Sequence, residues 1–226
     1  MKPILSLIAT LALAACGGGT NLSLSGRAGS TLAPPASPTA LTLSNGITVD
    51  HLRAVIREVK LERASAVPDD LADLQEFEVG PFLLDLSGAN LDGTVQQITI
   101  ADVPAGAYRE VRFKLHKPSS TESTDPKVQE MAGLSASIVI EGQIDGQPYT
   151  FISGVDAEER FAGSFNLASG DNNVTLNVDP STWFGGSGSA RLDPRVAGNK
   201  SAIENNIQAS MKVFDDDDHD GRPDHQ

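Results

Sequence analysis

Carboxylates gather near the C-terminus of this sequence, where the pattern D-x-D-x-D-G-x-x-D begins at Asp216. Carboxylates at alternate positions can converge on one hard cation, and a glycine at the sixth position permits the sharp turn of a calcium loop. The seventh residue of such a loop offers its backbone carbonyl, and the ninth supplies a further oxygen. The pattern therefore predicts a Ca2+ site with ligands from Asp216, Asp218, Asp220, Arg222 and Asp224.

This loop departs from the EF-hand pattern at its last ligand. The EF-hand takes a bidentate glutamate from position twelve, whereas the sequence reaches only position eleven, at Gln226. Calcium needs about six to eight oxygens, so we expect weak affinity unless other residues or waters complete the shell. A solvated acidic tail is the alternative interpretation. His219 and His225 would suit a transition metal, but the spacing of the carboxylates favours calcium.

The thiol of Cys16, the only cysteine in the chain, is the second chemically distinctive group. Lys2 gives a positive start, Ile4 to Leu13 is an apolar run, and small Ala14 and Ala15 precede the thiol. This is the layout of a secretory signal peptide, too short for a membrane span. A thiol at that place can carry a diacylglyceryl group, and two or more acyl chains anchor a protein stably.

The run Leu13-Ala14-Ala15-Cys16 resembles the lipobox of bacterial lipoproteins, in which the cysteine becomes the lipidated first residue of the mature chain. The resemblance implies a signal peptide over 1–15, lipidation of Cys16 and a place in the cell envelope. Gly17 stands where an aspartate would imply retention in the inner membrane, so the outer membrane is expected, on either its periplasmic or its surface side. The alternative is an ordinary signal peptide with a cysteine beside its cleavage site.

The charge balance excludes one class of partner. Lys and Arg number 17 against 30 Asp and Glu, a net charge of −13. Nucleic acid needs a basic face, so we expect no nucleic-acid partner. The same charge argues against tight docking on anionic lipid beyond the anchor. The expected partners are the membrane, through the lipid, and an envelope or surface ligand that the sequence does not identify.

The secondary-structure elements that must position these groups are predicted to form a β domain on a flexible tether. Residues 16–40 are mostly Gly, Ser, Thr, Ala and Pro, which predicts a flexible linker. From 41 to 198, short alternating strands and turn residues such as Asn45-Gly46 and Asp145-Gly146 predict a single antiparallel β-sandwich. Residues 51–63 fit either a helix or a strand, and we expect a strand. We expect a polar loop over 117–133.

The C-terminal part of the chain changes from strand to helix patterning. Ser201-Ala202-Ile203-Glu204 matches a capping box, in which Ser201 and Glu204 satisfy each other's free backbone donors. We predict a helix from about Ser201 to Val213, within a C-terminal segment 199–214. The acidic, calcium-loop-like tail would then occupy 215–226.

A wider family resemblance rests on turns and core strands. The residues that carry it are Ile56 to Glu62, Gly80-Pro81-Phe82, Pro104 to Tyr108 and the turn from Asp179 to Phe184. They resemble uncharacterised bacterial lipoproteins that carry a domain of unknown function. The resemblance implies a transthyretin-like or related β-sandwich and a strand over 51–63, but no activity.

Catalytic motifs such as G-x-S-x-G, H-E-x-x-H or a phosphate-binding G-x-x-x-x-G-K do not occur in the sequence. We therefore expect a non-enzymatic binding or structural module. A carbohydrate-binding module is one alternative and needs Trp183 exposed on a concave face, although a core position is favoured. A carboxylate-dependent hydrolase is the other alternative and needs acids converging in a deep cleft. His116, on the polar face of a strand, is expected to face solvent rather than to act in catalysis, and His51 is expected to have no chemical role.

Overall fold

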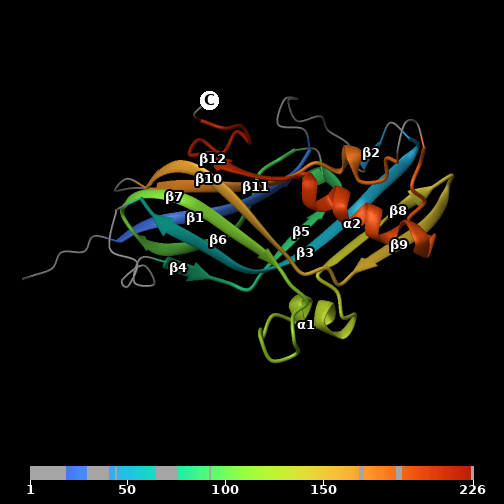
Figure 1. Ribbon diagram of the computed structural model, residues 1–226, viewed down its shortest axis with the longest axis horizontal. Coiled ribbons are helices and arrows are strands. Elements are labelled where there is room, and N and C mark those ends of the chain that lie inside the picture. The colour runs from blue at the N-terminus through green and yellow to red at the C-terminus, as the bar shows by residue number, and fades with distance from the viewer. Residues whose placement is uncertain are drawn as a thin grey trace, which may run out of the picture.

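The computed structural model describes residues 19–29, 41–43, 45–64, 76–91, 93–167, 171–186 and 190–224. Strands dominate these ranges, and the prediction of a mainly β fold with a short C-terminal helix is confirmed (Figure 1). In chain order the elements are β1 (Gly19–Ala28), β2 (Leu41–Thr42), β3 (Ile47–Arg63), β4 (Glu76–Val79), β5 (Phe82–Ser87), η2 (Gly88–Leu91), β6 (Gln96–Pro104), β7 (Gly106–Leu115), α1 (Pro126–Gly133), β8 (Ile138–Ile144), β9 (Gln147–Ser153), β10 (Ala157–Leu167), β11 (Asp171–Val178), η3 (Pro180–Thr182), η4 (Ala197–Asn199), α2 (Lys200–Ala209) and β12 (Met211–Asp215).

Two sheets pack face to face. The small sheet has the order β12-β11-β1-β6, and the large sheet has the order β10-β7-β3-β8-β9, with β2, β4 and β5 also paired to β3. Pairing is antiparallel except between β1 and β11, which run parallel with Asn21 opposite Asp171. The arrangement agrees with the predicted β-sandwich.

Strand β3 is the axis of the large sheet. It is 17 residues long and pairs with β8, β5, β7 and β4 along its length, which confirms a strand over 51–63. In its middle, Leu52, Ala54 and Ile56 face the main core while Val55 on the other face packs against Met131, in the helix at 126–133, so the apolar residues of β3 do not alternate cleanly. Because β3 runs from the β8 pairing to the β7 pairing, it connects the two ends of the molecule.

The core lies between the sheets and under α2. Leu22 and Leu24 of the small sheet join a buried cluster with side chains of the large sheet and with Ile203 and Ile207 of α2. Trp183 is 0% exposed and its Nε1 donates to Ser210 Oγ at 2.7 Å. The predicted core position of this tryptophan is confirmed. The alternative of carbohydrate binding through an exposed Trp183 is wrong, because the side chain is buried.

The predicted linker is wrong over residues 19–28, because these residues form β1 at the centre of the small sheet. Leu22 and Leu24 face the core, while the alternate residues Ser25 and Arg27 are also buried, on the opposite face. A composition of Gly, Ser and Thr suggested coil because nothing nearby in the sequence reveals what covers that second face. Residues 1–18, with Cys16, and residues 30–40 lie outside the described residues.

The C-terminal boundaries need correction as well. α2 ends at Ala209, where Ser210 Oγ donates back to the Ile207 carbonyl, and residues 211–215 form β12 against β11. The capping box is also wrong, because Asn199 is the N-cap residue and Glu204 instead accepts from Ser153 Oγ. The sandwich therefore extends beyond the expected range of 41–198, because β1 precedes that range and β12 follows it.

The expected polar loop over 117–133 contains a helix. Asp125 caps α1 by accepting from the Lys127 amide at 2.8 Å, and Pro126 occupies its first turn. Met131 of α1 packs with Val55 in a small second cluster on the large sheet. In the described ranges, no helix is long and apolar enough to cross a membrane.

Candidate metal-binding loop

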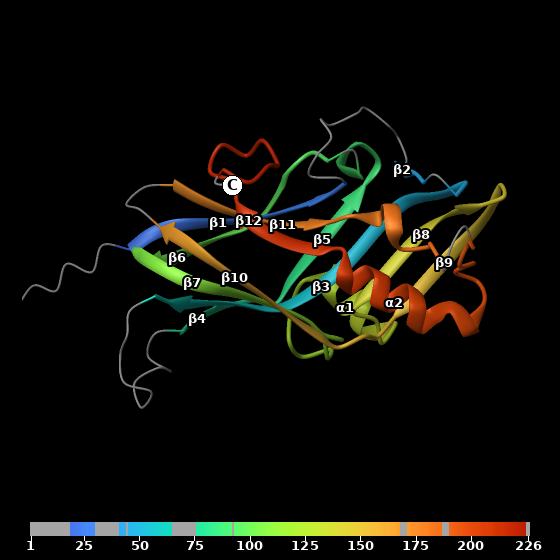
Figure 2. The same ribbon diagram turned by 45° about the horizontal axis from the view of Figure 1, so that its top comes forward.

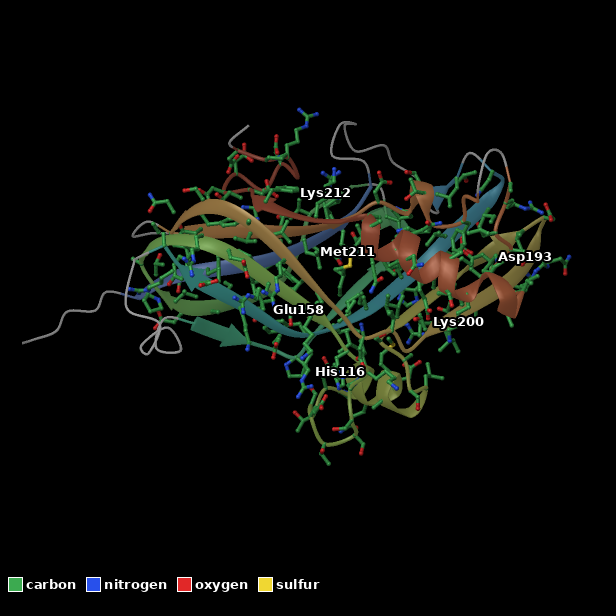
Figure 3. The ribbon with its side chains drawn as sticks, viewed as in Figure 1. His116, Glu158, Asp193, Lys200, Met211 and Lys212 are labelled. Carbon is green, nitrogen blue, oxygen red and sulfur yellow. The ribbon has the colours of Figure 1, made fainter. Side chains whose placement is uncertain are left out.

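The predicted calcium loop is held closed by hydrogen bonds between its two ends. Residues 216–224, called here the acidic loop, follow β12, whose first residues Met211 and Lys212 are labelled in Figure 3. The Asp224 amide donates to the Asp215 carbonyl at 3.0 Å, and the Asp217 amide donates to Asp224 Oδ2 at 2.5 Å. These contacts bring the end of the loop back to its start.

Three carboxylates converge inside this loop. One oxygen from each of Asp216, Asp218 and Asp220 lies within 4.8 Å of the other two. Asp216 Oδ1 accepts from the Gly221 amide at 3.0 Å, Asp218 Oδ1 from the Asp220 amide at 3.1 Å, and Asp220 Oδ1 from the Arg222 amide at 2.8 Å. Each bond turns a carboxylate toward the loop, and the left-handed conformation of Gly221, with φ of 79°, lets the chain reverse there.

The small sheet supports the buried member of this group. Asp216 is 0% exposed, and its Oδ2 accepts from Thr175 Oγ1 at 2.7 Å. The Asn173 carbonyl accepts from the Asp216 amide at 3.0 Å, the Asn173 amide donates to Asp217 Oδ1 at 3.0 Å, and Nδ2 donates to the Asp216 carbonyl at 2.8 Å. Ser25 Oγ of β1 donates to Asn173 Oδ1 at 2.7 Å, so a buried polar layer joins β1, β11 and the loop. The loop is thus a built part of the sandwich and is not a free tail.

A buried cation lies under the loop. Arg27 of β1 is 2% exposed, and its Nη1 donates to the Gly221 carbonyl. Burial lowers the pKa of Arg27, and the nearby carboxylates of Asp216 and Asp220 oppose that change. The guanidinium contacts Gly221, the sixth residue of the loop, from the side of β1, while Asp218 and Asp220 remain exposed.

Burial dominates the electrostatics of Asp216. It raises the pKa of this carboxyl above its ordinary value, against the hydrogen bonds from Thr175 and the Gly221 amide, which lower it. The neighbouring charges of Asp220 and Asp224 raise the pKa further. The carboxylates therefore repel one another, and the burial of Asp216 disfavours its charged form. A divalent cation bound among them would reduce both the repulsion and the desolvation cost.

The structure brings together only part of the predicted ligand set. Asp216, Asp218 and Asp220 form the group, and Asp224, whose Oδ2 accepts from the Asp217 amide, is not part of it. Arg222 contributes its amide to Asp220 and stays exposed as a side chain. Cys16 and His225 lie outside the described residues.

Sequence reasoning missed the residues beneath the loop. Arg27, Asn173 and Thr175 lie on alternate positions of their strands, opposite apolar residues that face the core. Period-two alternation in Ser-Leu-Ser-Gly-Arg and Asn-Val-Thr-Leu-Asn was the available signal. It reveals a strand with one apolar face, but it does not reveal that a loop buries the polar face.

Two histidines also have partners, where the sequence predicted no chemical role. His51 lies between Asp85 Oδ1, at 2.6 Å from Nε2, and Glu141 Oε2, at 3.1 Å from Nδ1. Burial raises the pKa of Asp85, but hydrogen bonds from Lys127 and His51 outweigh it and hold the pKa below its usual value. His116 Nδ1 lies 2.7 Å from Asp156 Oδ1. These contacts tie neighbouring strands and α1 together on the surface of the large sheet.

Comparison with known proteins adds one structural likeness. No protein-family model matches the chain, and no curated protein matches it. Among solved structures, the chain is similar to MbnP from Methylosinus trichosporium, with 11% sequence identity and a TM-score of 0.42, over 87% of this chain and 99% of that one.

Proposed function

We propose that this protein is a lipid-anchored, non-enzymatic module of the bacterial cell envelope whose acidic loop binds one calcium ion. The observation that carries the metal claim is the convergence of Asp216, Asp218 and Asp220 on a loop clamped to the small sheet. Hard carboxylate oxygens in this number favour Ca2+ over softer metals. Among the described residues, the converging group consists of aspartates alone and does not include His219, so it offers no softer nitrogen ligand.

The expected affinity is that of an extracellular module. Three converging carboxylates fall short of the six to eight oxygens that calcium takes, so water and backbone carbonyls must supply the rest. Such sites have dissociation constants of about 0.1 to 1 mM. The ion would act as a structural clamp that holds the acidic loop on β11 and β1.

The anchoring part of the proposal rests on the lipobox-like run that ends at Cys16. Membership of the uncharacterised lipoprotein family and a place in the outer membrane belong to the same proposal. Replacing Cys16 by Ala removes the acceptor of the lipid, so the variant should appear in the soluble fraction of cells. A variant that stays in the membrane fraction as the wild type does would contradict the anchor.

A binding or structural role is supported by the ion pairs that several surface carboxylates form with arginines. Glu62 pairs with Arg112 at 3.0 Å, and Asp145 pairs with Arg191 at 2.8 Å. Carboxylates held in surface ion pairs of this kind are poor candidates for proton transfer. Calcium binding is the property of this module to test first.

Isothermal titration of the purified protein with CaCl2 tests the metal claim. We expect saturable heat for the wild type and none for a double variant that carries Asp218→Asn and Asp220→Asn. Asp145→Asn is the matched control, because it removes one acid from a distant turn whose φ of 54° asparagine tolerates. Absence of heat and of any thermal shift in the wild type would remove calcium from the proposal.

A further inference from the structure

The position of β1 leaves almost no chain between the proposed anchor and the folded domain. Thr20 is already buried and lies opposite Val103 in the pairing of β1 with β6. Only Gly17 and Gly18 separate Cys16 from the first residue of β1. Three residue steps span at most about 11 Å. If Cys16 carries the lipid, as the proposed function requires, the domain has no long tether.

The same pairing identifies the part of the domain that is held near the membrane. Gly19 lies opposite Pro104, and the next strand, β7, begins at Gly106 beside Leu167 at the end of β10. Figures 1 and 2 both show β1 beginning at one end of the long axis and the β8–β9 hairpin at the other. We call the first of these the anchor end and the second the far end.

The turn nearest the proposed anchor carries no charge of its own, although exposed Asp102 and Arg109 flank it. At the anchor end, the turn from β6 to β7 exposes Pro104, Ala105 and Ala107, which carry no charge, and Tyr108 Oη donates to the Pro104 carbonyl at 2.6 Å. The far end is charged, with Arg195 paired to Asp193 at 2.7 Å, and Asp193 lies there in Figure 3. An uncharged turn approaches anionic headgroups without the repulsion that an acidic surface meets.

We propose that the turn 104–107 lies against the bilayer surface and that the sandwich stands away from the membrane on this end. β3 pairs with β7 near the anchor end and with β8 near the far end. Its 17 residues, at about 3.3 Å each, span roughly 55 Å. The β8–β9 hairpin is therefore presented up to about 50 Å from the bilayer, far beyond the roughly 8 Å over which membrane charge acts at physiological salt.

Thiol labelling tests this orientation, because a lipidated Cys16 leaves the chain without another cysteine. Ala105→Cys, between β6 and β7, and Gln147→Cys, at the start of β9, are both at exposed positions and receive the same fluorophore in the lipidated protein on vesicles that carry headgroup-attached quenchers. We expect strong quenching at position 105 and little at 147. Ala107→Cys repeats the measurement if the first variant folds poorly.

Three results separate the possible failures. Equal quenching at both positions in protein whose Cys16 lipid is confirmed by mass spectrometry would overturn the orientation and leave the anchor intact. Mass spectrometry that finds an unmodified Cys16 in native protein would overturn the anchor and the orientation with it. A long Gly-Ser insert after Gly18 should weaken quenching at position 105 while the protein stays on the vesicles, and unchanged quenching would mean that the spacer does not set the orientation.

Discussion

Replacing Asp216 by Asn is the sharpest perturbation of the proposed clamp. The change keeps the shape of the side chain and removes its charge. The amide oxygen can still accept from the Gly221 amide, and the new NH2 group can donate to Thr175 Oγ1, since a hydroxyl both donates and accepts. The variant should therefore keep the fold of the loop while it loses a calcium ligand.

The size of the expected effect follows from linkage. With a dissociation constant of about 0.1 to 1 mM, calcium at about 10 mM stabilises the folded state by roughly 1.4 to 2.7 kcal/mol. One kcal/mol corresponds to about 2–4 °C in Tm for a domain of this size. We therefore expect calcium to raise the Tm of the wild type by roughly 3–10 °C and to leave the Tm of Asp216→Asn unchanged.

The calcium-free comparison gives a second readout. Burial disfavours the charged form of Asp216, so the neutral variant should be at least as stable as the wild type in EDTA at pH 7. The assay is thermal unfolding followed by circular dichroism, with and without calcium. A calcium shift that survives in Asp216→Asn would refute the assigned ligand. Strong destabilisation in EDTA would instead mean that the charge of Asp216 is needed to balance Arg27.

Three further predictions use the same unfolding assay. The pKa of Asp216 is raised in the folded state, so its contribution to stability is present below the ordinary carboxyl pKa and is lost as pH rises through the raised value. In EDTA, the wild type should therefore lose stability relative to Asp216→Asn over that pH interval. Parallel curves of stability against pH for the two proteins would contradict this. Leu24→Ala should cost about 2–5 kcal/mol because Leu24 is buried in β1, whereas no change would restore the flexible linker. Trp183→Ala should cost about 3–5 kcal/mol and remove the near-ultraviolet signal of the only tryptophan, and a small loss would argue against its core position.

Local patterns predicted the large sheet well. The alternation in 108–116 and the Asp145-Gly146 turn each specify a strand or a hairpin within a few residues, whereas the apolar residues of β3 fit either a helix or a strand. Such signals need only the side-chain period and turn chemistry. α1 was missed although Asp125-Pro126 is a recognisable helix start, because its surroundings are polar and its apolar residues are few.

The remaining features depend on contacts between residues far apart in the sequence, which local patterns do not predict. The polar face of β1 is buried by segments far along the chain, as Arg27 contacts the carbonyl of Gly221, 194 residues later. Likewise, residues 211–215 continue the helical spacing of α2 in sequence, but β11 offers them a free edge and they form β12. The alternate aspartates were therefore read correctly as a converging group, while the sheet that supports them was not predictable from local sequence.

A crystal structure of the protein grown with calcium tests the central claim most directly. We predict one ion between Asp216, Asp218 and Asp220, with oxygens about 2.3–2.6 Å away and an anomalous signal at its position. Density for water alone among these carboxylates, in protein soaked at saturating calcium, would contradict the account.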